Sequence, residues 1–228
     1  MNNERELTFI CEECFYKIPV IMKAKYSNLK GIRIDGISGG HLDGTCPNCG
    51  KKVFFFSVDK AMGNIVSILH QRKYLTGFSC QGHSYTTFEK NDGANTMHIR
   101  YAFDRPYITI ESSRTKSKGL LKTFLDADFN EISFCNFYSK EYAKHINESF
   151  IIKDNIDDYI EFWERSCEVA IYLDESKIKA QYKKVVSAFE GKKASDNILD
   201  KVDEKIDKYF EYKCNQLASL LKKNLDRI

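Results

Sequence analysis

Short stretches of alternating apolar and polar residues mark strands in the first two thirds of the chain. Apolar residues occupy every second position over residues 97–103, and a similar run follows at 107–111 after the turn Asp104-Arg105-Pro106. Alternation with a period of two is typical of a strand that buries one face. Further short apolar runs, at residues 7–10, 18–22, 53–56 and 132–137, predict additional strands.

Helical spacing of apolar residues appears in shorter and longer stretches. Residues 62–69 and 120–125 predict short helices, the first with Asp59 as its cap. Two longer stripes, over 156–189 and 199–225, are separated by a short segment that begins at Gly191. A short connection favours an antiparallel pair of helices.

Three aromatic residues of this helical region, Trp163, Tyr209 and Tyr212, fall outside the narrow apolar seam between the two expected helices. Bulky aromatic side chains commonly anchor protein interfaces. We therefore expect the C-terminal helices to bind a protein partner or to associate with a second copy of the chain.

The eight cysteines contain two closely spaced pairs, Cys11/Cys14 and Cys46/Cys49. A spacer of two residues lets both thiolates of a turn reach one ion, and two such turns complete a tetrahedral set of four sulfur ligands. Buried free cysteines and a redox-active pair are the alternatives, but two paired turns favour a metal. Because a closed set of four thiolates leaves no position for a substrate, we expect one structural Zn²⁺ per chain.

Residues 7–56, which contain both cysteine pairs and the apolar runs beside them, resemble the zinc-ribbon family. The resemblance implies that Cys11, Cys14, Cys46 and Cys49 bind the zinc ion and that two β-hairpins carry the paired turns. It covers no other part of the chain.

Together these patterns predict an α+β protein made of three blocks. Residues 1–58 form a zinc ribbon, and residues 59–153 form a body in which helices cover a small mixed or antiparallel sheet. Residues 154–228 form an antiparallel helical hairpin that is similar to a coiled coil. The sign of the net charge reverses at the last boundary, from positive to negative, which favours a separately used C-terminal module.

A second group of reactive side chains surrounds the turn that holds Cys80 and His83. Their spacing suits half of a metal-binding turn, which His98 or Cys135 would complete. Alternatively, Cys80 is a nucleophile with His83 or His98 as its base. The plainer interpretation is a tight turn with a packed cysteine and a polar histidine.

Basic residues beside aromatic residues are candidate nucleic-acid contacts, because cations hold phosphates while aromatic rings stack on bases. The candidates are Arg72, Lys73, Arg100 and Arg105. Polar sheet surfaces also carry such residues without any ligand. The formal net charge of +3, from 35 basic and 32 acidic residues, is low for a dedicated nucleic-acid binder.

No apolar run reaches the roughly 18 residues of a membrane-spanning helix, and the first residues do not form a signal peptide. We therefore expect a cytoplasmic protein without membrane contact. The many Lys, Asn and Ile residues and only 3 prolines suit a phage or mobile-element source.

The hypothesis that follows is a non-enzymatic, zinc-stabilised, macromolecule-binding accessory protein that acts on a host protein or nucleoprotein machine. One alternative is an enzyme that uses Cys80 and His83 on RNA or a nucleotide. The other alternative is a nucleic-acid-binding adaptor without catalysis.

Overall fold

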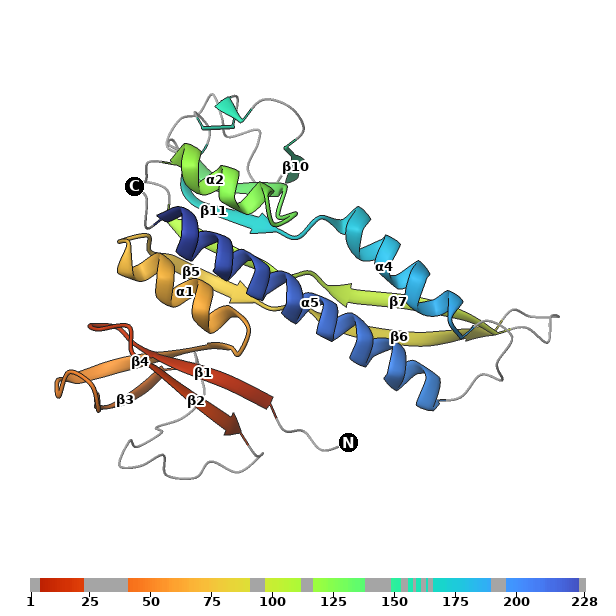
Figure 1. The fold of residues 1–228 in the computed structure, drawn as a ribbon, viewed down its shortest axis with the longest axis horizontal. Helices are drawn as coiled ribbons and strands as arrows, with labels where there is room; N and C mark the ends of the chain where they lie inside the picture. Colours follow the sequence, from red (N-terminus) through yellow and green to blue (C-terminus); the bar gives the residue numbers. More distant parts are fainter. Residues whose placement is uncertain are drawn as a thin grey trace.

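The computed structural model describes residues 5–22, 41–90, 97–111, 117–137, 149–152, 156–157, 159–160, 163, 166–189 and 196–225. These residues form antiparallel sheets with helices packed against them, which confirms the predicted α+β class (Figure 1). Among them, no helix combines the length and the apolar character needed to cross a membrane.

The first sheet has the strand order β2-β1-β4-β3 and is built from two hairpins. Its strands are β1 (Arg5–Cys11), β2 (Lys17–Met22), β3 (His41–Thr45) and β4 (Lys52–Asp59). The antiparallel pairing of β1 with β4 joins the hairpins side by side. Three of these strands were predicted, whereas β3 was missed because it follows a glycine-rich segment, of which residues 36–40 lie outside the described residues.

The second sheet has the order β10-β9-β11-β8-β5, and every neighbouring pair is antiparallel. Its strands are β5 (Thr76–Cys80), β8 (Tyr107–Glu111), β9 (Glu131–Phe137), β10 (Ser149–Ile151) and β11 (Ser166–Tyr172). The central strand, β11, interrupts the helix predicted over residues 156–189, although the described residues 157, 159, 160 and 163 are helical. Val169, Ala170 and Ile171 are all buried in the strand. Because a continuous apolar run shows no alternation, it fits the spacing of a helix as well as that of a buried strand.

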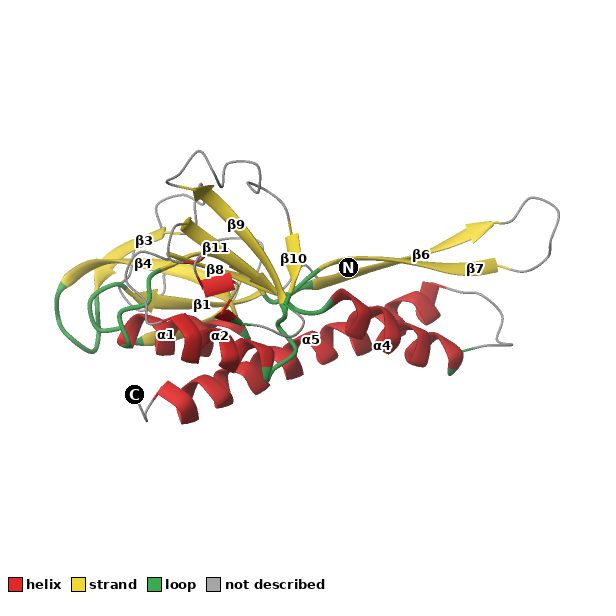
Figure 2. Ribbon diagram, turned by 90° about the horizontal axis from the view of Figure 1, so that it is seen from above, coloured by secondary structure: helices red, strands yellow, loops and turns green. Residues whose placement is uncertain are grey.

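The helices are α1 (Met62–Gln71), α2 (Ser117–Leu125), α4 (Glu175–Ser187) and α5 (Asp196–Leu225). The predicted C-terminal hairpin is present as α4 and the first half of α5, which run antiparallel (Figures 1 and 2). The second half of α5 continues along α1 and α2. Its apolar side chains belong to the same buried core as those of α1 and of the second sheet.

The aromatic residues expected at a partner surface take different positions. Trp163 is fully buried in the core and Tyr209 is half-buried against it, whereas Tyr212 is exposed on α5. The first two residues are therefore used inside the fold, and a partner for the C-terminal helices stays a prediction. The boundaries at residues 58 and 153 are likewise predictions.

A long hairpin of β6 (His83–Lys90) and β7 (Met97–Asp104) extends beside α4 and α5 (Figures 1 and 2). Backbone N–H groups on the free edge of β6 donate to carboxylates of α5: Ser84 N to Asp207 at 2.9 Å and Thr86 N to Asp203 at 3.0 Å. The ring of Tyr101 stacks on that of Tyr182 with centroids 4.7 Å apart. Helix α5 thus satisfies a strand edge that no other described strand covers.

Candidate metal centre

The two cysteine turns have the same backbone geometry. In the first turn, Phe15 N donates to Cys11 O at 2.9 Å, and in the second Gly50 N donates to Cys46 O at 2.9 Å. The first cysteine of each turn also donates its N–H across the turn, to Tyr16 O at 3.0 Å and to Lys51 O at 2.9 Å. Each turn closes one hairpin, between β1 and β2 or between β3 and β4.

Each turn contains one residue in the left-handed backbone region, Phe15 with φ 56° and Gly50 with φ 70°. Glycine adopts this conformation freely, whereas a side chain costs roughly 1–2 kcal/mol. Phe15 is held there because its ring packs edge-on against His70 at 5.3 Å and its carbonyl accepts a hydrogen bond from Ser67 Oγ at 3.2 Å. The first turn is thereby fixed to α1.

The antiparallel pairing of β1 with β4 places both turns at the same end of the first sheet, because the last residue of β1, Cys11, lies opposite Phe55 in the first half of β4. The sulfur atoms of Cys11, Cys14, Cys46 and Cys49 lie within 4.8 Å of one another. Cys14 Sγ and Cys46 Sγ are 3.6 Å apart. A tetrahedral zinc ion with Zn–S bonds of about 2.3 Å requires sulfur separations of roughly 3.8 Å. The predicted convergence of the four cysteines is confirmed, and the cluster fits a metal ion.

The surroundings of the four thiols differ. Burial raises the pKa of Cys11 to about 12. Burial acts in the same direction on Cys14, but hydrogen bonds from Asn48 Nδ2, at 3.4 Å, and from the Tyr16 backbone outweigh it and lower the pKa of Cys14 to about 6. Metal binding requires thiolates, so Cys14 offers a ready ligand and the ion must displace the proton of Cys11.

The structure also brings Cys80 and His83 together, and it adds a residue that the sequence did not indicate for this site. The ligand atoms of Asp59, Cys80 and His83 lie within 4.8 Å of one another. Asp59 was predicted to cap the helix at residue 62, but the N-cap of α1 is Ala61, without a side-chain hydrogen bond. Asp59 instead ends β4 and accepts a hydrogen bond from Gln81 N at 3.1 Å.

His98 does not lie near this group. In the β6–β7 hairpin, His83 is opposite Asp104, whereas His98 is opposite Glu89 near the other end. The side chains of His98 and Cys135 lie outside the described residues.

The environment of Cys80 does not suit a nucleophile. Burial raises its pKa to about 11, and the negative charges of Asp59 and Asp104 act in the same direction. A nucleophilic cysteine needs the opposite, an electropositive environment that stabilises the thiolate.

The four predicted nucleic-acid contacts do not form one surface. Arg105 is half-buried, donates to Glu131, lies 3.9 Å from Glu175 and stacks over the Tyr172 ring. Arg100 is exposed on β7, and Lys73 follows the end of α1.

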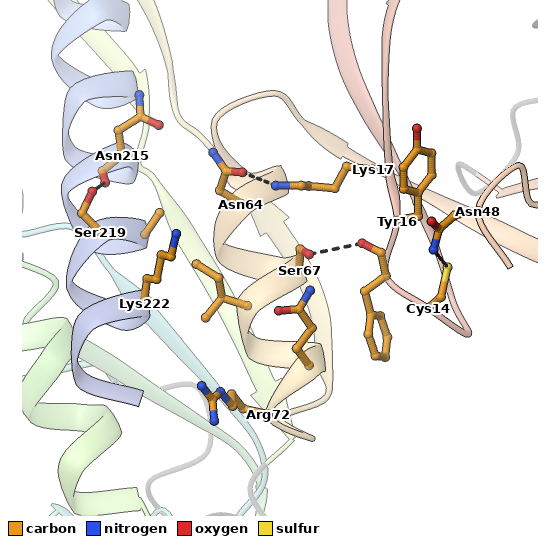
Figure 3. A pocket seen from close by; sticks show the side chains of 14 residues that line it. Cys14, Tyr16, Lys17, Asn48, Asn64, Ser67, Arg72, Asn215, Ser219 and Lys222 are labelled. Atoms are coloured by element: carbon orange, nitrogen blue, oxygen red, sulfur yellow. Dashed lines mark hydrogen bonds between the residues drawn. The ribbon is translucent and has the colours of Figure 1, made fainter. Parts of the chain in front are cut away.

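Arg72 instead lines a groove of about 680 Å³ that polar and apolar side chains share, and α1 lies there between the first cysteine turn and α5 (Figure 3). Lys17 and Lys222 line the same groove. The sequence did not indicate these two lysines because they belong to opposite ends of the chain. The described residues that line it are Cys14, Phe15, Tyr16, Lys17, Asn48, Asn64, Ser67, Ile68, Gln71, Arg72, Asn215, Ala218, Ser219 and Lys222.

Comparisons with models of known protein families, with curated proteins and with solved structures find no match. Function must therefore be inferred from the geometry of the molecule itself.

Proposed function

We propose that this chain is a non-enzymatic protein that binds single-stranded nucleic acid in the groove that Arg72 lines, with zinc held by Cys11, Cys14, Cys46 and Cys49. The observation that supports this proposal most is the charge of the groove. Lys17, Arg72 and Lys222 line it, and none of its described lining residues is a carboxylate. A lining that contains three cations and no carboxylate suits the phosphates of a nucleic-acid backbone.

The remaining lining groups fit the same ligand. Asn48, Asn64, Gln71 and Asn215 supply side-chain amides that can donate to phosphate or base oxygens. Tyr16, which precedes Lys17 in the chain, is 43% exposed, and an exposed aromatic ring gives an unpaired base a surface on which to stack. Single strands are favoured over duplexes because only unpaired bases expose their faces.

The zinc ion would act on this groove through the first cysteine turn. Tyr16 and Lys17 come two and three residues after Cys14, and Lys17 Nζ donates to Asn64 Oδ1 of α1 (Figure 3). A metal that fixes the turn therefore fixes one wall of the groove. Its role is structural, because four thiolates fill the tetrahedral coordination shell.

The test is fluorescence anisotropy with a labelled oligothymidine and a labelled oligouridine of about 12 nucleotides, a length within the range that single-strand-binding folds contact. The wild-type protein should bind at low salt, and Lys222→Gln should weaken binding several-fold because a phosphate contact is lost. Lys184→Gln removes an exposed charge from α4, outside the groove, and should leave affinity unchanged. Absence of binding to both oligonucleotides, or equal losses in the two variants, would contradict the proposal.

A further inference from the structure

Asp59, Cys80 and His83 form a second cluster of metal ligands, separate from the four cysteines. The three residues come from different strands, at the end of β4, the end of β5 and the start of β6. Asp59 is 6% exposed, and Cys80 and His83 are half-buried. Since their ligand atoms all lie within 4.8 Å of one another, one ion can reach a carboxylate oxygen, a thiolate and an imidazole nitrogen.

The imidazole of His83 has a buried nitrogen that nothing else in the fold explains. His83 Nε2 is shielded from solvent and has no hydrogen-bond partner among the described residues. The Asp59 carboxylate is 3.8 Å away, which is too long for a hydrogen bond. Buried polar atoms in native proteins nearly always have a partner, and an ion is one of the groups that explain an exception. A metal ion bound beside this imidazole would give His83 Nε2 the partner that it lacks among the described residues.

The turn between Cys80 and His83 is built tightly enough to hold its ligands in place. Gly82 has φ +87°, and a Cβ there would meet Pro106 at 2.6 Å and Phe210 at 2.8 Å, so only glycine fits. Gly82 N donates to Cys80 Sγ at 3.3 Å. Gln81 is held at the junction of β4 and α1, since its side chain accepts from Ala61 N at 3.1 Å.

We propose that Asp59, Cys80 and His83 bind a divalent transition-metal ion, with zinc favoured by the mixed oxygen, sulfur and nitrogen ligands. Three protein ligands leave one tetrahedral position for water or a small ligand, in contrast to the closed set of four cysteines. Cys80 also borders a pocket of about 580 Å³ that Asp104, Arg105 and Tyr107 help to line.

The test is the metal content of the full chain, measured by mass spectrometry after a chelating resin has removed loosely bound ions. The wild-type protein should carry two zinc ions per chain, one in each cluster. Asp59→Asn, Cys80→Ser and His83→Gln should each carry one. Cys214→Ala removes a buried thiol from α5 that belongs to neither cluster and should keep two.

Wild-type protein with a single zinc ion, or two ions retained in all three ligand variants, would overturn the proposal. If a variant does not fold, titration of metal-free wild-type protein with Co²⁺ decides. The second equivalent should give a weaker thiolate charge-transfer band than the first, because one thiolate binds it instead of four. Saturation after one equivalent would contradict the second site. The result is independent of nucleic-acid binding, so either proposal can fail alone.

Discussion

At the scale of single residues, the two cysteine turns differ in the residue that adopts the left-handed backbone conformation. Gly50 adopts it without a side chain, whereas Phe15 adopts it because its ring packs against His70. The two turns thus reach one backbone geometry by different means, one through conformational freedom and the other through packing.

We expect Gly50→Ala to lower the free energy of unfolding by about 1 kcal/mol, because alanine is strained at φ +70° although its Cβ would meet no other atom there. Gly50→Asn should cost less, since asparagine tolerates this region better. Denaturant unfolding of the metal-loaded protein measures both. Equal stability of the wild type and Gly50→Ala would contradict this account of the turn.

At the level of single residues, the sequence indicated side chains that meet in the fold where they lie close together along the chain. Spacing alone indicated Cys11 with Cys14, Cys46 with Cys49, and Cys80 with His83. It did not indicate Asp59, which reaches Cys80 only because β4, α1 and β5 fold back on one another. Lys17 and Lys222 were missed for the same reason, since only tertiary packing brings α5 to the first cysteine turn.

At the scale of elements, Asp174 separates β11 from α4. Its carboxylate accepts from Ser176 N at 2.7 Å and from Lys177 N at 3.4 Å, which caps the helix. The predicted helical stripe breaks near this residue, and the break is where the helix begins. Residues 166–172, which precede it, were predicted as helix because a central strand buried on both faces lacks the alternation that identifies a strand.

Asp174→Ala should destabilise the protein by about 1 kcal/mol at neutral pH, whereas Asp174→Asn should be nearly neutral because asparagine is an equally good cap. Thermal unfolding monitored by circular dichroism measures the difference. An alanine variant as stable as the asparagine variant would contradict the capping role.

The contribution of Asp174 to the stability of the protein should also depend on pH. Burial alone would raise the pKa of Asp174, but hydrogen bonds from Ser176, Asn130 and Lys177 outweigh it and lower the pKa. A pKa lowered in the folded state gives stability that is present above the unfolded value, near 4, and is lost as pH falls through the folded value. The wild type should therefore lose stability relative to Asp174→Asn as the pH falls below the unfolded value. From pH 5 to 8 the difference in the free energy of unfolding between the two proteins should remain constant.

At the scale of the whole molecule, α5 connects the parts of the fold. It contacts α1, α2, α4 and β6, and its buried residues share one core with the second sheet. The hypothesis of a separable C-terminal module must be tested against this packing.

We expect the fragment 1–153 to be insoluble, because it lacks both α5 and β11, the central strand of the second sheet. Size-exclusion chromatography with light scattering tests this, with the full chain as its control. A soluble, monodisperse and metal-loaded fragment would show instead that residues 154–228 form a separate module.

The most direct test of the proposed function is the salt dependence of oligonucleotide binding. Each phosphate contact to a single strand contributes about 0.7 to the slope of log affinity against log salt. Replacing Lys17, Arg72 and Lys222 together with glutamine should therefore reduce the slope by about 2, while metal content and folding stay as in the wild type. An unchanged slope and affinity in a folded, metal-loaded triple variant would contradict binding of nucleic acid in this groove.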